Sequence, residues 1–305
     1  MSPSLHHICT VLKLVIRQAN CPVLVRREVT MIPVKKILFP ADFSNRCGGA
    51  AHAVRTVARR FEAEVMPLHV LELASPKGVP EYLLNQAHQA MEALIADKFT
   101  GCKVIPCVTT GDPAVKIIEH ALAGRFDLIM MPTHGYGPFR QFLLGAVTAK
   151  VLHDAVCPVW TSVHLEDWPL IENVMLRNIL CGIDFGPRSS AALKYASQMA
   201  AEFKANLTVA HAIPLLETPA SSPQWRDRVA KAAEERVRGI EEEIGVSARV
   251  EILDGSPAYG MSELAERLNA DLMIIGRTHV AADFAKLGSN AYAIIAHSPC
   301  PVLSV

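Results

Sequence analysis

Short apolar runs alternate with helical patterns along most of the chain. Lys36–Ala41 and Val65–Leu71 have the length and composition of buried strands, and between them apolar residues from Ala50 to Phe61 recur every three or four positions, as on one face of a helix. The alternation continues, with further strands predicted at Lys103–Val108, Leu128–Met131, Val159–Val163, Asn178–Ile183, Leu207–Ile213, Arg249–Leu253, Leu272–Ile275 and Val302–Val305. Alternating strands and helices of this kind predict parallel sheets covered by helices on both faces.

The second half of the 305-residue chain repeats the first. The matching residues are Asp42 and Asp184, His69 and His211, and Cys157-Pro158-Val159 and Cys300-Pro301-Val302, each pair 142 or 143 positions apart. Each half has the size of an ordinary domain. We therefore predict two domains, residues 33–163 and 177–305, joined by a polar linker over residues 164–176.

Residues 1–32 resemble a partial third copy of the last helix and strand. Val11–Val25 ends on a Cys-Pro step and an apolar run, as both domains do, but no domain precedes it. Two explanations stay open. Either the segment is an extension that is not translated or not ordered, upstream of a start at Met31, or its strand Val23–Arg26 pairs with an exposed sheet edge.

Local signals predict how two helices begin, end and face the solvent. Asp112 precedes Pro113, which suits a capping side chain followed by the first helical turn, and Gly124 is expected to end that helix. A long helix is predicted from Val229 to Ile244. Its charged side, expected to face water, consists of Glu234, Glu235, Arg236, Arg238, Glu241, Glu242 and Glu243.

The overall charge argues against two classes of partner. Lys plus Arg and Asp plus Glu both number 30, so the formal net charge is zero, and nucleic-acid binding, which rests on phosphate neutralisation, is not expected. Although half of the residues are hydrophobic, no apolar run reaches the roughly 18 residues that span a bilayer. The N-terminus also lacks a signal-peptide cleavage pattern. We expect a cytoplasmic protein that does not bind membranes.

The eight cysteines are expected to be buried, reduced thiols. Cys102 and Cys107 lie five positions apart, but no further ligands nearby complete a metal quartet. We predict no metal site, and a redox role for these thiols is a subordinate hypothesis.

Two glycine-bearing loops are the main candidate for chemistry, one in Asp127–Val163 and one in Asp271–Val305. The first places Pro132, Gly135, Gly145 and Ala146 at the four positions of the pattern G-x2-G-x9-G-(S/T). The second keeps Gly276, Gly288 and Ser289, but it lacks the middle glycine and is shorter. This pattern resembles the loop that holds nucleotide phosphates in ATP-binding universal stress proteins. The resemblance covers about residues 33–305.

The resemblance implies a fold and a set of ligand residues. The implied fold class is α/β, with two tandem doubly wound parallel five-stranded sheets of strand order 3-2-1-4-5, like adenine nucleotide alpha hydrolases. That order places strands one and four side by side at the point where the winding reverses, where such sheets bind ligands. The implied nucleotide-binding positions are Asp42, Val70, Gly135, Gly145, Ala146 and Val147 in domain one, and Asp184, Ala212, Gly276, Gly288, Ser289 and Asn290 in domain two.

Physical chemistry favours domain two as the nucleotide site. Glycines allow close backbone approach to an anion, a helix N-terminus presents N–H groups, and a serine hydroxyl adds one donor. Domain two keeps these features. In domain one Pro132 lacks an N–H group and Ala146 lacks a hydroxyl.

Each of these residues also has a purely structural interpretation. Asp42 and Asp184 could cap the following helices, and His69 and His211 could be hydrogen-bonded core histidines. Gly145 and Gly288 could serve tight packing at a helix start. Arg140 and Arg277 could contact phosphates or face water.

The resemblance implies a stress-response binding or signalling protein gated by an adenine nucleotide such as ATP, with Mg²⁺ as an optional companion. The two domains are expected to pair through their last strands, and a homodimer stays open. No Walker lysine, G-x-S-x-G elbow or H-E-x-x-H motif occurs, so we predict no enzyme and no catalytic residues. The alternatives are a nucleotide-free interaction scaffold that acts through its domain-pairing surface, and a weak ATP hydrolase.

Overall fold

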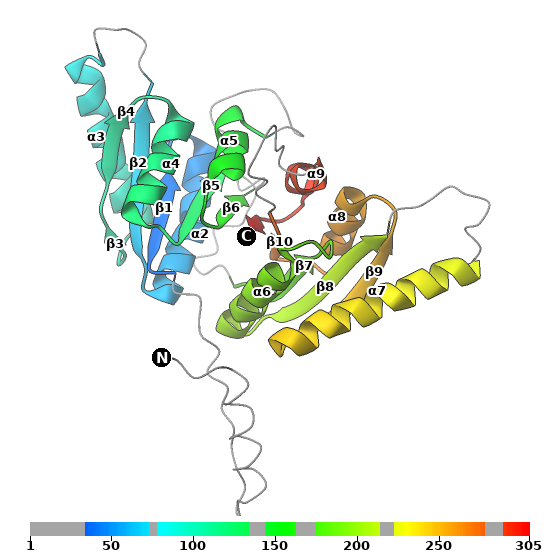
Figure 1. Cartoon of the computed structure of the whole chain (residues 1–305). Coiled ribbons are helices and arrows are strands. Elements are labelled where there is room, and N and C mark those ends of the chain that lie inside the picture. The colour runs from blue at the N-terminus through cyan, green and yellow to red at the C-terminus, as the bar shows by residue number, and fades with distance from the viewer. Residues whose placement is uncertain (1–33, 73–77, 134–143, 163–174, 214–222, 278–288) are drawn as a thin grey trace, which may run out of the picture. The chain divides into compact units, whose positions relative to one another are not determined.

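The computed structural model describes residues 34–72, 78–133, 144–162, 175–213, 223–277 and 289–305. Its first domain alternates strands and helices as the sequence predicts (Figure 1). The elements are β1 (Lys36–Pro40), α2 (Asn45–Phe61), β2 (Glu64–Leu71), α3 (Glu81–Lys98), β3 (Lys103–Val104), β4 (Cys107–Thr110), α4 (Pro113–Gly124), β5 (Leu128–Pro132), α5 (Ala146–Asp154) and β6 (Val159–Ser162). The possible third copy in residues 1–32 lies outside the described residues.

The second domain repeats this order. Its elements are β7 (Asn178–Gly182), α6 (Ser189–Phe203), β8 (Asn206–Ile213), α7 (Pro223–Ile244), β9 (Arg249–Asp254), α8 (Pro257–Arg267), β10 (Leu272–Ile275), α9 (Ser289–His297) and β11 (Val302–Ser304). None of the helices in the described part of the chain combines the length and the apolar character that a membrane crossing requires.

Both domains have the predicted strand order. In domain one β2 lies between β1 and the pair β3 and β4, and β1 continues to β5 and β6. In domain two the order is β9-β8-β7-β10-β11. Every strand pair within a domain is parallel, as right-handed crossovers through helices require. The predicted order 3-2-1-4-5 is therefore confirmed twice.

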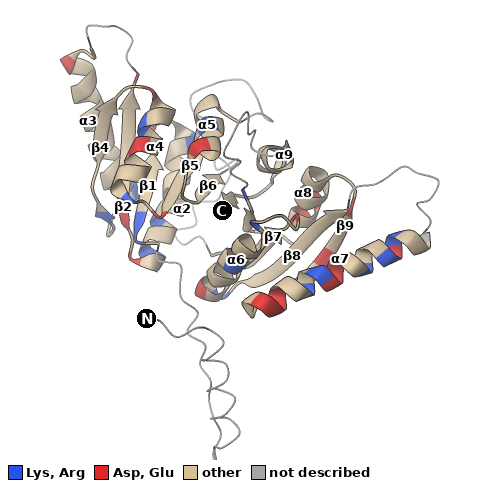
Figure 2. Ribbon diagram, in the orientation of Figure 1, with Lys and Arg blue, Asp and Glu red and all other residues tan. Residues whose placement is uncertain are grey.

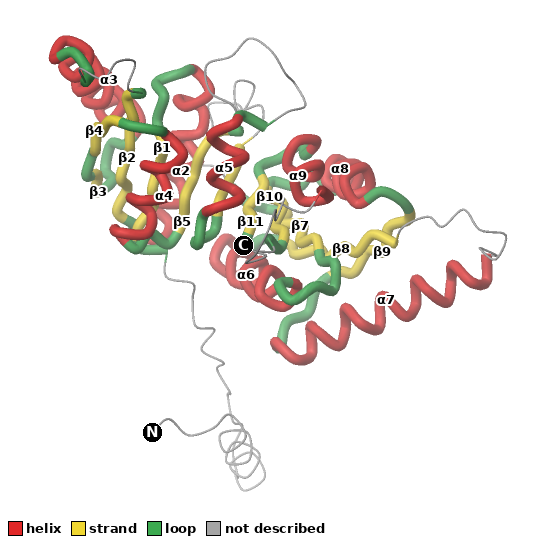
Figure 3. The backbone as a smooth tube through the Cα atoms, turned by 45° about the horizontal axis from the view of Figure 1, so that its top comes forward, coloured by secondary structure: helices red, strands yellow, loops and turns green. Residues whose placement is uncertain are grey.

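Helices cover both faces of each sheet (Figure 3). One apolar cluster joins the sheet to α2, α6 and the inner side of α7, and includes Phe39, Val54, Leu193 and Val237. The other joins the opposite face to α4, α5, α8 and α9. Successive strand residues enter opposite clusters, Phe39 the first and Leu38 the second. The strands are apolar on both faces because both faces are covered.

The predicted start and end of α4 are both confirmed. Asp112 accepts a hydrogen bond from Val115 N at 2.8 Å and Pro113 opens α4, as expected. Gly124 is the last residue of α4, as predicted, but the left-handed residue that follows the helix is Arg125, at φ 50°. The glycine serves packing instead, because a Cβ there would lie 2.3 Å from the ring of Phe126.

The predicted strand Lys103–Val108 is split in two. Ile105 N still donates to Val65 O at 2.9 Å, but Pro106 has no N–H group to continue the ladder. Pairing with β2 resumes at Cys107, so that β3 and β4 are separate strands.

The aspartates that open the two long motif segments have a structural role. Asp127 Oδ2 accepts from the backbone N–H groups of Lys35 and Lys36 at 2.8 and 2.9 Å. Asp271 Oδ2 does the same for Arg177 and Asn178 at 2.7 and 2.9 Å. These hydrogen bonds join the start of β5 to the start of β1 in domain one, and the start of β10 to the start of β7 in domain two. They help to set the register of these neighbouring strands.

The charged side of α7 is not wholly solvated. Figure 2 shows acidic and basic residues distributed along the helix. Glu241, however, is only 3% exposed, and its carboxylate accepts from Ala248 N at 2.9 Å and pairs with Arg238 at 2.7 Å. The prediction of a fully solvated face is wrong at this residue because the chain folds back after the helix and offers it a backbone donor.

The two domains join edge to edge. β11 pairs with β6 in antiparallel register, with Leu303 opposite Trp160, so the described strands form one continuous sheet. The ends of α2 and α6 also meet, through the rings of Phe61 and Phe203 at 6.1 Å and an ion pair of Arg60 with Glu202 at 2.7 Å. The expected pairing through the last strands is thus present within one chain.

The described cysteines are all free thiols. Burial raises the pKa of Cys47, Cys157 and Cys300 from 9.0 to about 11, and that of Cys181 to about 12. These four thiols therefore stay protonated and unreactive at neutral pH in the folded chain.

Two glycine substitutions should have opposite effects on stability. Gly124→Ala should lower the free energy of unfolding by about 1–3 kcal/mol, because its Cβ overlaps the buried ring of Phe126. Gly239→Ala, in the interior of α7 with nothing within 4 Å of the new Cβ, should raise it by about 0.5–1 kcal/mol. Urea unfolding of the full chain measures both, and equal effects would contradict this packing.

Alkaline pH should destabilise the protein through its thiols. Unfolded thiols ionise near 9.0, whereas the folded Cys181 thiol keeps its proton to about pH 12. The unfolded state thus gains stability as pH rises above 9, so the thiol contribution to folding is complete below pH 9 and lost above it. Urea unfolding across this range should show a shallower decline for Cys181→Ala than for the wild type, and parallel declines would contradict the assignment.

Candidate functional site

A cavity of about 320 Å³ lies in domain two, beyond the carboxyl ends of β7 and β10. It is lined by Gly182, Ile183, Asp184, Ser189, Ala210, His211, Ala212, Pro257, Met261, Ile275, Gly276, Asn290, Ala291 and Ile294. The two strands pair side by side, with Ile275 opposite Gly182. The cavity therefore opens where the winding of the sheet reverses, at the position where doubly wound sheets bind ligands.

The structure brings most of the predicted domain-two residues to this cavity. Asp184, Ala212, Gly276 and Asn290 all line it, although they come from four different parts of the domain. Ser289 begins α9 at the edge of the same region. Gly288 and the side chain of Ser289 lie outside the described residues.

Asp184 is held by a tight turn rather than acting as a helix cap. Its Oδ1 accepts from Gly186 N at 2.7 Å and from Ser189 Oγ at 3.1 Å. Asp42 makes the matching turn, with Oδ1 accepting from Ser44 N at 3.0 Å and Ser44 Oγ at 2.7 Å, while Ser44 itself caps α2. Oδ2 of Asp184 has no partner among the described residues, so this exposed oxygen is available to accept a hydrogen bond from a ligand.

The two repeated histidines are anchored to the backbone. His69 Nδ1 lies 2.7 Å from Ala41 O, and His211 Nδ1 lies 2.9 Å from Ile183 O. A carbonyl oxygen can only accept, so the proton sits on Nδ1 in both rings. The interpretation of these residues as hydrogen-bonded structural histidines therefore fits the geometry.

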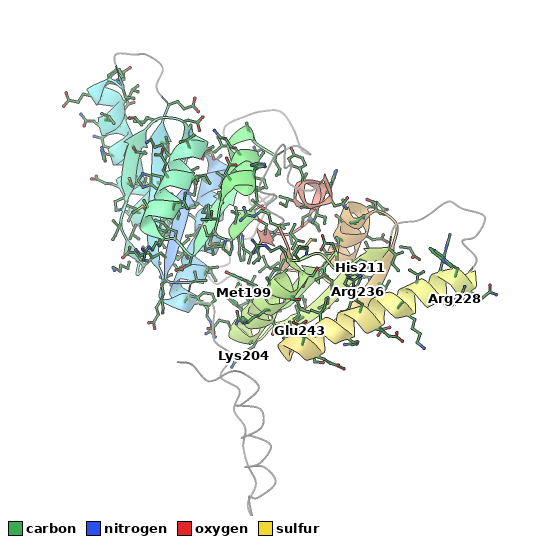
Figure 4. All side chains as sticks on the ribbon, viewed as in Figure 1. Met199, Lys204, His211, Arg228, Arg236 and Glu243 are labelled. Carbon is green, nitrogen blue, oxygen red and sulfur yellow. The ribbon has the colours of Figure 1, made fainter. Side chains whose placement is uncertain are left out.

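An aromatic stack supports the histidine in domain two. The ring of Phe185, whose backbone has φ 59°, lies 4.1 Å from that of His211. The guanidinium of Arg236 lies over the same Phe185 ring, 4.4 Å from its centroid. Figure 4 labels Arg236 on α7 and His211 on β8. Phe43 and His69 repeat the pair in domain one at 4.4 Å. The stack fixes the turn that presents Asp184 to the cavity.

Gly276 has no room for a side chain. A Cβ at this position would approach the Cβ of Arg188 to 3.0 Å and its backbone carbonyl to 3.5 Å. The glycine thus allows the end of β10 to pack against the start of α6, and the backbone there stays accessible to a ligand in the cavity.

In domain one, two backbone N–H groups just before α5 are already hydrogen-bonded. Gly145 is the residue before α5, but its N–H group donates to Thr133 O at 2.9 Å. The neighbouring Leu144 N donates to the hydroxyl of Tyr292 in domain two, at 3.2 Å. The remaining described candidates of this domain are Asp42 and Val70 at the ends of the first two strands and Ala146 and Val147 in the first turn of α5. Gly135 lies outside the described residues.

The expectation for Arg277 is wrong. It neither reaches the cavity nor faces water: it is 3% exposed, and its guanidinium donates to Leu152 O at 2.7 Å and Cys157 O at 2.8 Å, both in domain one. Burial lowers its pKa to about 10, so it remains charged at neutral pH. Arg140 lies outside the described residues.

Sequence reasoning missed the cross-domain contacts of Arg277 and Tyr292. The repeat itself carried a signal, since the matching positions of domain one hold Thr133 and Ala149. A long polar side chain that replaces a short one in only one copy of a duplication indicates a contact made in only one direction.

The described residues contain no group of three side chains suited to hold a metal ion. The fold and the cavity together define a duplicated, doubly wound α/β protein with a cavity where the winding of its second sheet reverses. The chain belongs to the universal stress protein family, whose model matches residues 33–162 and 175–305.

Known relatives agree with this assignment. Universal stress protein MJ0531 of Methanocaldococcus jannaschii is 32% identical over 136 residues, 41% of this chain and 79% of that protein. Universal stress protein A homolog 1 of Coxiella burnetii is 33% identical over 138 residues, 42% of this chain and 95% of that protein. The crystal structure of a universal stress protein from Archaeoglobus fulgidus superimposes with a TM-score of 0.67 at 24% identity, covering 90% of this chain and 97% of that one. The shared fold thus extends over both domains.

Proposed function

We propose that this universal stress protein is a stress-response binding protein that responds to an adenine nucleotide held in domain two. The observation that carries the proposal is the cavity of about 320 Å³, which gathers four of the predicted ligand positions. Its volume is within the range of small-molecule sites, about 300–1,000 Å³.

The lining of the cavity suits the parts of a nucleotide. Met261, Ile275 and Ile294 supply an apolar wall against which a flat base can pack. The free Oδ2 of Asp184 can accept from a base amino group or a ribose hydroxyl. The phosphates would lie toward Gly276 and the N-terminus of α9, where backbone N–H groups and the helix dipole favour anions. A Mg²⁺ ion would enter with the phosphates.

Domain one is the weaker candidate. Pro132 lacks an N–H group, Ala146 lacks a hydroxyl, and the N–H group of Gly145 is committed to Thr133 O. A phosphate there would have fewer donors than the full glycine-loop pattern supplies.

The scaffold alternative loses its proposed surface. β6 and β11, the strands that would recruit a partner, pair with each other in this chain. A scaffold would have to act through another face. Hydrolysis is retained only as an outcome of the experiment below.

A matched pair of substitutions tests the site. Ala212→Phe should fill the cavity and weaken ATP binding by at least about tenfold, which is about 1.4 kcal/mol. Val70→Phe, at the equivalent position of domain one, should leave that affinity nearly unchanged. Titration calorimetry with ATP and Mg²⁺ measures both, and mass spectrometry of the denatured wild type identifies any nucleotide that copurifies.

Other outcomes lead to different conclusions. Loss of binding in Val70→Phe alone would move the site to domain one. An absence of binding and of copurified nucleotide would contradict the proposal and favour the scaffold. Steady phosphate release that Ala212→Phe abolishes would add hydrolysis to the function.

A further inference from the structure

Besides the contacts between the ends of α2 and α6, two kinds of side-chain hydrogen bond join the domains. The first kind obeys the pseudo-twofold symmetry of the duplication: Thr161 Oγ1 donates to Val302 O and Ser304 Oγ donates to Val159 O, both at 3.2 Å. Thr161 and Ser304 occupy equivalent positions, as do Val159 and Val302. Each domain therefore donates one equivalent hydrogen bond to the other.

The second kind is made by domain two alone. Arg277 reaches Leu152 O and Cys157 O, and the hydroxyl of Tyr292 accepts from Leu144 N. The equivalent residues of domain one are too short to reciprocate. Thr133, which matches Arg277, donates to Ser162 O within its own domain at 3.1 Å, and Ala149 replaces Tyr292. Domain two is therefore attached to domain one by side chains that have no counterpart in the opposite direction.

Burial of the Arg277 guanidinium costs desolvation free energy, so its position inside the protein indicates a specific role. A buried cation is destabilising unless its hydrogen bonds and charge are compensated. Here the compensation is the C-terminal end of α5, where Leu152 O is one of the last carbonyls of the helix and the helix dipole is negative. Its Nε has no partner among the described residues, so the compensation depends on the two carbonyl contacts.

Two segments that line the domain-two cavity, the end of β10 and the start of α9, are held to domain one by Arg277 and Tyr292. Gly276 lines the cavity and Arg277 follows it directly, with Arg277 N donating to Val305 O at 2.7 Å. Asn290 lines the cavity from α9, the helix that also carries Tyr292. The end of β10 and the start of α9 are thus each one or two residues away from a contact with domain one.

We propose that Arg277 is a positioning residue through which domain one holds the Gly276 wall of the domain-two cavity, so that ligand affinity in domain two depends on domain pairing. Tyr292 supports the same wall from α9. The inference rests on the proposed function for the identity of the ligand, but not for the positioning itself.

Two readouts on the full-length chain test the proposal. Arg277→Met keeps the length of the side chain but removes its donors, and should increase hydrogen–deuterium exchange both at residues 272–277 and in the last turn of α5. It should also weaken ATP binding about tenfold without filling the cavity. Arg277→Lys, which keeps the charge but cannot make both hydrogen bonds, should have an intermediate effect on both readouts.

The matched control is Thr161→Val, which removes a cross-domain hydrogen bond at the same seam but has no contact with the cavity. It should leave exchange at residues 272–277 and ATP affinity unchanged. If Arg277→Met fails to fold, Arg277→Lys and Tyr292→Phe carry the test, each with a smaller shift in the same direction.

The outcomes separate this inference from the proposed function. Unchanged exchange at residues 272–277 in Arg277→Met, or an equal effect of Thr161→Val, overturns the positioning role whatever the protein binds. Increased exchange together with unchanged ATP affinity overturns the dependence of the ligand on domain pairing. A wild type that binds no ATP refutes the proposed function alone, and the exchange data then still decide whether Arg277 holds the wall.

Discussion

The antiparallel pairing of β6 with β11 is the constraint on which the architecture depends. Each of these strands is the outermost of its own parallel sheet, and an unpaired outer strand exposes a row of backbone donors and acceptors. Pairing the two edges satisfies both rows within one chain and buries Trp160 and Leu303. Because the two strands are equivalent in the duplication, this pairing also imposes the pseudo-twofold relation between the domains.

Next to this symmetric seam, the described residues of the two domains differ. Domain two has an open cavity whose glycine wall is continuous with Arg277, whereas in domain one backbone N–H groups at the start of α5 are already bonded. The residues that attach the domains asymmetrically are neighbours of the candidate site. The two copies of the duplication therefore differ in the described residues at the carboxyl ends of their strands.

The sequence predicted correctly the features that depend on interactions between residues close in the chain. Apolar periodicity located the strands and helices, and Asp112 with Pro113 marked the start of α4. The family pattern identified Asp184, Ala212, Gly276 and Asn290, which do converge on one cavity. The errors have a common cause. Glu241 and Arg277 were interpreted by their charge, but the environment of each is decided by a hydrogen-bond partner that folding brings to it.

The sequence by itself determined the duplicated α/β class and the positions of the helices and strands, because helix and strand periods, caps and a repeated motif act over a few residues. The strand order and the ligand positions at the point where the winding reverses came from the resemblance to a known family. Only the tertiary structure decided which polar side chains are buried. Arg277 donates to Leu152 O, which is 125 positions away in the sequence, and no local sequence pattern predicts a hydrogen bond between residues so far apart in the chain. A charged side chain is exposed by default, and it is buried only where folding supplies the hydrogen bonds that compensate it.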